Sequence, residues 1–223
     1  MRSQGVNTRL DYSDAVAVIA CVSILLMGVS SYATRAGYQI ATGVLCAVVC
    51  LAPTLMKRAG LFRLPPVFVS VIMLAIVLHA YGVLLLSYDV IKYYDTMTHS
   101  ISSVVVAMCV FYTLMCYQVY SKGVVSFTGV KMSLMIALVM LGFSAYWEVF
   151  EYIVDLTTGT TMQYSPFDTL RDMLCNTCGT LVVCAFAGAY TRDRPLETLV
   201  DSFGLHPRLQ RFIEDPFGEK DKQ

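Results

Sequence analysis

Six apolar runs, each close to 20 residues long, constrain the fold of this chain more than any other feature. A helix needs about 20 apolar residues to cross a bilayer, and only helices or closed barrels satisfy the backbone there. Of the 223 residues, 57% are hydrophobic and 14% are charged, whereas soluble domains carry about a quarter charged residues. The sequence therefore predicts an all-α, polytopic membrane protein with six transmembrane helices. The predicted spans are about 14–33, 38–56, 66–88, 97–120, 131–155 and 167–190.

Lysines and arginines in the connectors predict the orientation, because they are enriched in cytoplasmic connectors. Only Arg35, Lys92 and Arg171 lie in one set of connectors, whereas the other 13 of the 16 lie in the alternate set and at both termini. We therefore expect both termini in the cytoplasm and the protein in the inner or plasma membrane of the cell. The expected parts are a cytosolic N-terminus at 1–13, a membrane domain at 14–190 and a cytosolic tail at 191–223.

Net charge and cysteine placement argue against two kinds of function. The formal net charge is zero, which offers no general attraction to nucleic acid. The eight cysteines lie almost wholly in the apolar runs, so we interpret them as small hydrophobic residues rather than as a disulfide framework. Cys175 and Cys178 have the spacing of a redox pair, but a position within a membrane helix makes that interpretation weak.

Acidic residues recur at helical spacing in the last three runs, at the ends expected to lie toward the extracytoplasmic side. Within each run they share one helix face, because they are three, four or seven residues apart. An ionised acid at the bilayer centre costs about 2.5–3.5 kcal/mol on insertion scales, so such a cluster requires compensation. The cluster consists of Asp95 and His99, then Glu148, Glu151 and Asp155, and finally Asp168, Asp172 and Asn176.

We interpret this cluster as a metal site. Its six carboxylates cannot all stay ionised without countercharge, and the nearby basic residues are only Lys92 and Arg171, which is about a quarter-turn off the acidic face. Helical bundles build metal sites by projecting carboxylates and histidine inward from facing helices. Oxygen ligands favour magnesium, manganese or calcium, and a histidine admits iron, manganese or zinc. The expected ligands are Asp95, His99, Glu148, Glu151, Asp172 and Asn176.

A divalent metal in this position predicts a hydrolase or group transferase that acts on an amphiphilic substrate, either lipid-like or phosphorylated. Asp168 or Asp155 would then act as the general base, and we predict these two as the catalytic residues. The expected partners are membrane lipid and the small amphiphilic substrate.

Other interpretations stay open. The acids could be protonated and link the helices by hydrogen bonds, or they could bind the cation or proton of a transporter. A transporter also needs an inner exit, which the apolar inner halves of the last three runs do not offer. A non-catalytic scaffold is a further alternative. Asp168 could simply cap a helix that starts at Ser165 and Pro166, and Asp155 could face water.

Three sequence blocks resemble the YjdF-like integral membrane proteins. The blocks are YDTMTH at 94–99, AYWEVFE at 145–151 and FDTLRDMLCNTCG at 167–179. That family shows D-x-x-x-H, W/Y-E-x-x-E and W-D-T-x-x-D-M blocks, and Phe167 stands where the family often has tryptophan. The resemblance covers roughly 66–190 and implies a shared fold and a shared site, but it supplies no reaction.

The distribution of basic residues predicts that the connector after the fourth run is cytoplasmic and that the one after the fifth lies outside. Single cysteines introduced at Lys122 and Thr158, with the native cysteines replaced, test this orientation. In intact cells, a membrane-impermeant thiol reagent should label the Thr158→Cys variant and spare the Lys122→Cys variant. Reversed labelling would overturn both the orientation and the outward position of the site.

Overall fold

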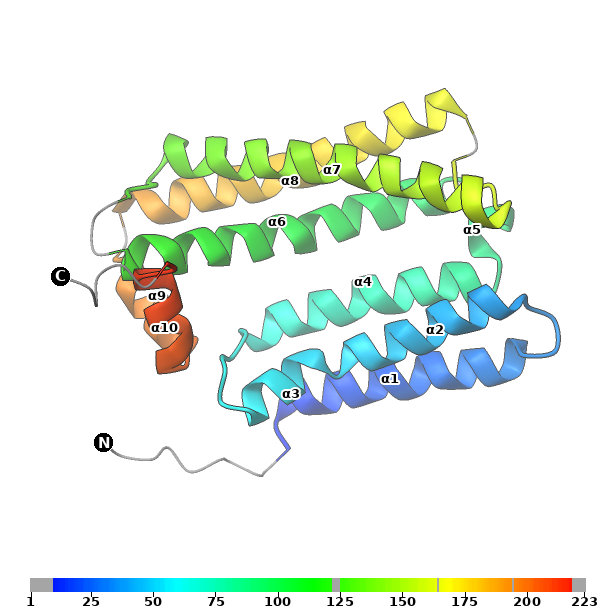
Figure 1. The fold of residues 1–223 in the computed structure, drawn as a ribbon, viewed down its shortest axis with the longest axis horizontal. Coiled ribbons are helices and arrows are strands. Elements are labelled where there is room, and N and C mark those ends of the chain that lie inside the picture. Colours follow the sequence, from blue (N-terminus) through cyan, green and yellow to red (C-terminus); the bar gives the residue numbers. More distant parts are fainter. Residues whose placement is uncertain (1–9, 122–124, 164, 194, 218–223) are drawn as a thin grey trace. The chain divides into compact units, whose positions relative to one another are not determined.

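The computed structural model describes residues 10–121, 125–163, 165–193 and 195–217, which form ten helices and no strands (Figure 1). Six segments are long and apolar enough to span a membrane, which confirms the all-α fold with six spans. The sidedness of the termini stays a prediction; residues 1–9, Lys122 and 218–223 lie outside the described ranges. The spans are α1 (Tyr12–Ser31), α2 with α3 (Gly37–Cys50 and Ala52–Arg58), α4 (Pro66–Leu84), α6 (Tyr94–Tyr120), α7 (Val130–Thr158) and α8 (Pro166–Asp193).

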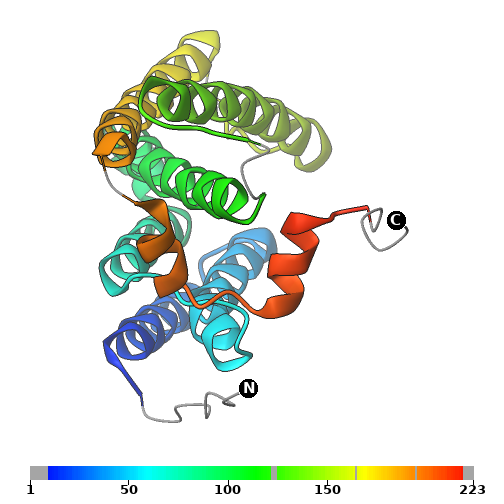
Figure 2. The same cartoon turned by 90° about the vertical axis from the view of Figure 1, so that its left-hand side faces the viewer.

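The helices are grouped in two compact units. The first comprises Met1–Lys92 with Glu197–Gln223, and the second comprises Tyr93–Leu196. In the first, α1 packs along both α2 and α4; in the second, α8 packs along α6 and α7, which contact each other less. Figure 2 shows α6, α7 and α8 in a view along their length. The whole acidic cluster belongs to the second unit, where α6, α7 and α8 carry it. The expected division at 13/14 and 190/191 stays a prediction.

The second predicted span consists of two helices in series. It was expected to be continuous from about 38 to 56, but α2 ends at Cys50 and α3 begins at Ala52. Pro53 lies in the first turn of α3, where its missing N–H cannot complete the hydrogen bond that would continue α2. The proline thus divides the span without changing its apolar character.

The third span ends earlier than expected, at Leu84 instead of near 88. Leu86 adopts a left-handed conformation with φ of 57°, and the short helix α5 (Ser87–Val90) follows. The ring of Tyr88 folds back onto Gly82, where a Cβ atom would lie 2.2 Å from the tyrosine Cε2. The Tyr88 hydroxyl then lies 2.9 Å from Nδ1 of His79. This histidine therefore has a side-chain partner within the first unit.

The C-terminal tail contains two short helices. They are α9 (Leu196–Ser202) and α10 (Pro207–Glu214), and the second was not predicted. Backbone hydrogen bonds join this tail to the connector between α3 and α4. The Arg63 N–H donates to the Phe203 carbonyl at 2.7 Å, and the His206 N–H donates to the Leu61 carbonyl at 2.8 Å.

Close approach of α8 to α6 shapes the second unit directly below the acidic cluster. A Cβ atom at Gly179 would lie 2.1 Å from the Ser103 Oγ and 2.8 Å from the Ser100 carbonyl oxygen. Small residues at such positions let membrane helices pack closely, because lipid provides no hydrophobic drive for association. Gly179 therefore sets the distance between α6 and α8 one turn below Asn176.

We predict that Gly179→Ala lowers the melting temperature of the purified protein in detergent. The added methyl group meets backbone of α6, and overpacking of this kind costs about 1–3 kcal/mol. Gly142→Ala on α7 is the matched control, because nothing lies within 4 Å of its Cβ position. The control should melt at or above the wild-type temperature, since alanine favours a helix interior by roughly 0.5–1 kcal/mol over glycine. Equal melting of the two variants would contradict the close approach.

Candidate functional site

The predicted site residues come together at one end of the second unit. The chain enters α6 at Tyr94 after Tyr93, whose φ is 64°, so that Asp95 lies in the first turn of the helix. Glu148 and Glu151 lie in the last four turns of α7. After the connector, α8 begins beside them. Ser165 caps α8 as expected: its Oγ and its carbonyl oxygen accept from the Asp168 N–H at 3.2 and 2.9 Å.

Three donor groups form the most compact part of the site. Single ligand atoms of Asp95, His99 and Asp172 all lie within 4.8 Å of one another. The Nε2 atom of His99 is 3.4 Å from Oδ1 of Asp95, one helical turn away. Asp172 reaches them from α8 and is only 2% exposed. Ligands of one ion with bonds of about 2.1 Å lie up to about 4.2 Å apart, so a small contraction of this group suits a divalent cation.

Glu148 and Glu151 line the α7 side of the site but lie outside this compact group. Both are buried, at 5% and 7% exposure. Electrostatic interactions couple Glu148 to His99 and Asp95, and couple Glu151 to Glu148 and Asp95. Oε1 of Glu151 accepts a hydrogen bond from the Trp147 indole N–H at 2.8 Å. Within the described ranges, Oε1 of Glu148 has no hydrogen-bond partner.

Arg171 is a member of the site that the sequence analysis underestimated. Its position off the acidic face argued against it, but its long side chain curls back over α8. The guanidinium pairs closely with Asp168 and lies 3.7 Å from Oδ2 of Asp95 and 3.8 Å from Oδ1 of Asp172. The i, i+3 spacing from Asp168 is the only signal in the sequence that indicates this contact.

Acidic side chains outnumber cationic ones in the contacts described for this site. Five carboxylates converge at this end of the unit, and four of them are buried. The cationic side chains in the contacts described for these acids are Arg171 and, if protonated, His99. Buried carboxylates at this density favour protonation or a bound cation. The five acids are Asp95, Glu148, Glu151, Asp168 and Asp172.

Asn176 and Asp168 have structural partners. The Asn176 Nδ2 donates to the Ser144 Oγ at 2.9 Å, which ties α8 to α7 within the buried interior. Oδ1 of Asp168 pairs with Arg171, and Asp168 is not a member of the group formed by Asp95, His99 and Asp172. The roles of Asn176 as a ligand and of Asp168 as a base stay predictions.

Asp155 organises the connector between α7 and α8. Its Oδ1 accepts from the Thr160 hydroxyl at 2.7 Å and from the Met162 N–H at 2.8 Å, and its Oδ2 accepts from the Gln163 N–H at 2.9 Å. The Gln163 amide then donates to the Glu148 carbonyl oxygen at 2.9 Å and lies 3.4 Å from Oε2 of the same residue. Asp155 thus holds the connector against the site, and its assignment as a catalytic base stays a prediction.

The cysteines agree with their interpretation as small hydrophobic residues. All eight are free, including Cys175, which is half-buried, and Cys178, which is exposed on α8. The redox spacing of this pair is therefore not accompanied by a disulfide.

Comparison with known proteins gives one match. The model of a protein family described as "Predicted membrane protein (DUF2238)" matches residues 15–193, which include the whole acidic cluster and all six spans except the first three residues of α1. This match is consistent with the resemblance of the three sequence blocks to a YjdF-like membrane family. No curated protein and no solved structure matches the chain.

We predict that Asp155→Ala loosens the connector without unfolding the helices. Three hydrogen bonds to a charged acceptor are lost, each worth about 1.5–3 kcal/mol where it is buried and less at this half-exposed position. Hydrogen exchange at the Met162 and Gln163 amides should therefore accelerate at least about tenfold. Thr157→Ala is the control, because the Thr157 hydroxyl bonds only carbonyls of its own helix at 2.9 and 3.1 Å. Unchanged exchange in Asp155→Ala would show that the carboxylate does not hold the connector.

Proposed function

Because the chain belongs to the family of predicted membrane proteins described as DUF2238, whose description gives no reaction, we propose its function from the site itself. We propose that this multi-pass membrane protein binds a divalent cation through Asp95, His99 and Asp172. With that cation it acts as a metal-dependent hydrolase or group transferase. The proposed substrate is amphiphilic, either lipid-like or phosphorylated. The proposed location is the inner or plasma membrane, with the site on the extracytoplasmic side.

The observation that carries this proposal is the convergence of three ligand atoms from two helices within 4.8 Å. Asp95 and His99 belong to one helical turn, so their spacing alone follows from helix geometry. Asp172 comes from another helix, and its carboxylate is almost fully buried. A buried acid placed against another acid is costly unless a proton or a cation lies between them.

The donor chemistry narrows the class of metal. Two carboxylates and one imidazole resemble the mixed oxygen and nitrogen sets that suit manganese, iron or zinc, whereas magnesium and calcium prefer oxygen ligands alone. Glu148 and Glu151 supply further oxygen atoms beside the group. Asn176 completes the proposed ligand shell only if the Ser144 contact leaves its Oδ1 free to turn toward the site.

The surrounding residues support a role in proton transfer and substrate access. A bound cation would polarise a phosphoryl or ester oxygen and activate water. Glu148 is the best-placed proton acceptor, because its Oε1 is buried and has no hydrogen-bond partner in the described chain. We prefer it to Asp168 and Asp155, whose oxygens are engaged by Arg171 and by the connector. Exposed apolar side chains on α8, at Phe167, Leu170 and Leu174, offer an amphiphile a lipid-facing approach.

Metal content and thermal stability test the cation site. The wild-type protein in detergent should hold about one manganese, iron or zinc ion per chain, and a chelator should lower its melting temperature. Added metal should restore the melting temperature by mass action. At a concentration 100 times the dissociation constant, binding raises the free energy of unfolding by about 2.7 kcal/mol. Asp172→Asn and Asp95→Asn should lose most of this metal dependence, because each removes a proposed ligand, whereas Asp155→Asn is the matched control and should keep it.

Metal-independent melting would favour protonated acids that link the helices by hydrogen bonds. In that case Asp172→Asn and Asp95→Asn would be nearly neutral, because an amide preserves a hydrogen bond. The reaction class is tested separately with phospholipids and phosphorylated amphiphiles, by metal-dependent release of phosphate or fatty acid from wild-type protein and Asp172→Asn. Cation uptake into proteoliposomes without any such release would replace the enzyme proposal with a transporter.

A further inference from the structure

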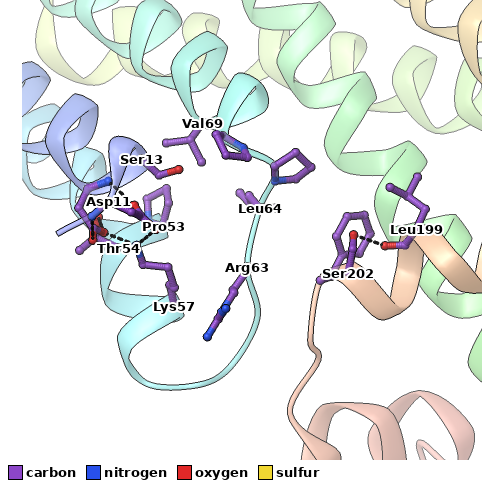
Figure 3. A pocket seen from close by; sticks show the side chains of 14 residues that line it. Asp11, Ser13, Pro53, Thr54, Lys57, Arg63, Leu64, Val69, Leu199 and Ser202 are labelled. Carbon is purple, nitrogen blue, oxygen red and sulfur yellow. Dashed lines mark hydrogen bonds and ion pairs between the residues drawn. The ribbon is translucent and has the colours of Figure 1, made fainter. Parts of the chain in front are cut away.

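A cavity in the first unit is lined by residues that do not belong to the acidic site, and it has no part in the function proposed above. Its volume is about 390 Å³, which is within the range of pockets that hold small molecules. The start of α1, the end of α3, the beginning of α4 and helix α9 surround it (Figure 3). These are the ends of three membrane spans, so the cavity lies where lipid headgroups meet the protein.

The two acids of the cavity already have partners at every oxygen. Oδ1 of Asp14 accepts from the Thr54 hydroxyl at 3.0 Å and lies 2.6 Å from the Lys57 Nζ, and its Oδ2 accepts from the Asp11 N–H at 3.2 Å. Oδ1 of Asp11 accepts from the Asp14 N–H at 3.1 Å, and its Oδ2 lies 2.8 Å from the same Lys57 Nζ. The Lys57 ammonium beside Asp11 holds the pKa of that carboxyl below its usual value. Neither acid is therefore available to a cationic ligand.

Arg63 differs from these acids, because its charged group is not engaged by a neighbouring side chain in the described chain. Its side chain lines the cavity and is exposed, and within the part of the chain that the structure describes its guanidinium has no hydrogen bond or ion pair. Only its backbone N–H is engaged, by the Phe203 carbonyl at 2.7 Å, which keeps the residue at the mouth of the cavity. A guanidinium suits the oxygens of a phosphate, because it presents several donors in one plane.

The remaining walls are largely apolar. Leu64, Val69, Leu199 and Phe203 line the cavity together with three prolines. Such walls accept hydrocarbon, and the adjoining membrane is a source of it. The combination of an unpartnered guanidinium with an apolar lining therefore matches a ligand that has an anionic head and an acyl chain.

We propose that this cavity binds the phosphate headgroup of an anionic phospholipid through Arg63, with the upper part of an acyl chain against Leu64, Leu199 and Phe203. The binding holds α9 against the connector between α3 and α4. It thereby couples the lipid composition of the adjoining leaflet to the position of the C-terminal tail.

Thermal melting and native mass spectrometry of the full-length protein in detergent test the proposal, with phosphatidylglycerol as the probe. Phosphatidylglycerol should raise the melting temperature by several degrees and remain bound, whereas phosphatidylcholine and glycerol 3-phosphate should do neither. Arg63→Gln should weaken phosphatidylglycerol binding about tenfold or more, because a charge-assisted hydrogen bond is lost. Ser202→Trp, which fills the cavity from α9, should weaken it as well.

Arg58→Gln is the matched control, because it removes the same charge from an exposed position near the same membrane edge and does not line the cavity. It should retain wild-type binding. Equal loss in Arg58→Gln and Arg63→Gln would overturn the proposal in favour of general surface attraction. Normal binding by Ser202→Trp would place the lipid outside the cavity, and equal stabilisation by glycerol 3-phosphate would identify a soluble phosphate compound instead of a lipid.

Discussion

The need to neutralise buried charge separates the two units of this protein. An ionised side chain in surroundings of low dielectric is costly unless it is paired and hydrogen-bonded. The first unit meets this condition, because every oxygen of Asp11 and Asp14 has a partner and one lysine serves both acids. In the second unit five acids converge, and the contacts described for them include one arginine and one histidine. The contrast distinguishes an ion cluster that stabilises a fold from a site that still requires a ligand or protons.

Helix α8 both carries buried acids of the site and holds the second unit together. It packs along both α6 and α7, and Gly179 brings it against α6 directly below the acids. The Asn176 amide bonds Ser144 on α7 at the same level. Asp172, on the same helix, is buried and lies close to Asp95 and His99. Rigid helices are better supports for such a group of ligands than loops are.

Much of the fold was predictable because hydrophobicity and helical periodicity are local properties of the chain. Six spans were expected and six are present, and α6 and α8 begin within a few residues of their predicted starts. The errors occur where one residue changes the backbone: Pro53 divides the second span, and the left-handed Leu86 ends the third. Helix α10 was missed because its eight residues begin with a proline and lie in a polar, charged tail with no apolar run to indicate it.

The sequence by itself determined that acids recur on single helix faces of three spans, since spacing along a helix decides which residues share a face. Which of those acids meet was decided only by the tertiary structure, because it depends on how each helix is rotated about its own axis and how far each side chain reaches. Asp95, His99 and Asp172 form the compact group, whereas Glu148 and Glu151 lie beside it. Arg171 reaches the site because its side chain is long. Asp155 instead binds the connector, because backbone N–H groups there require an acceptor.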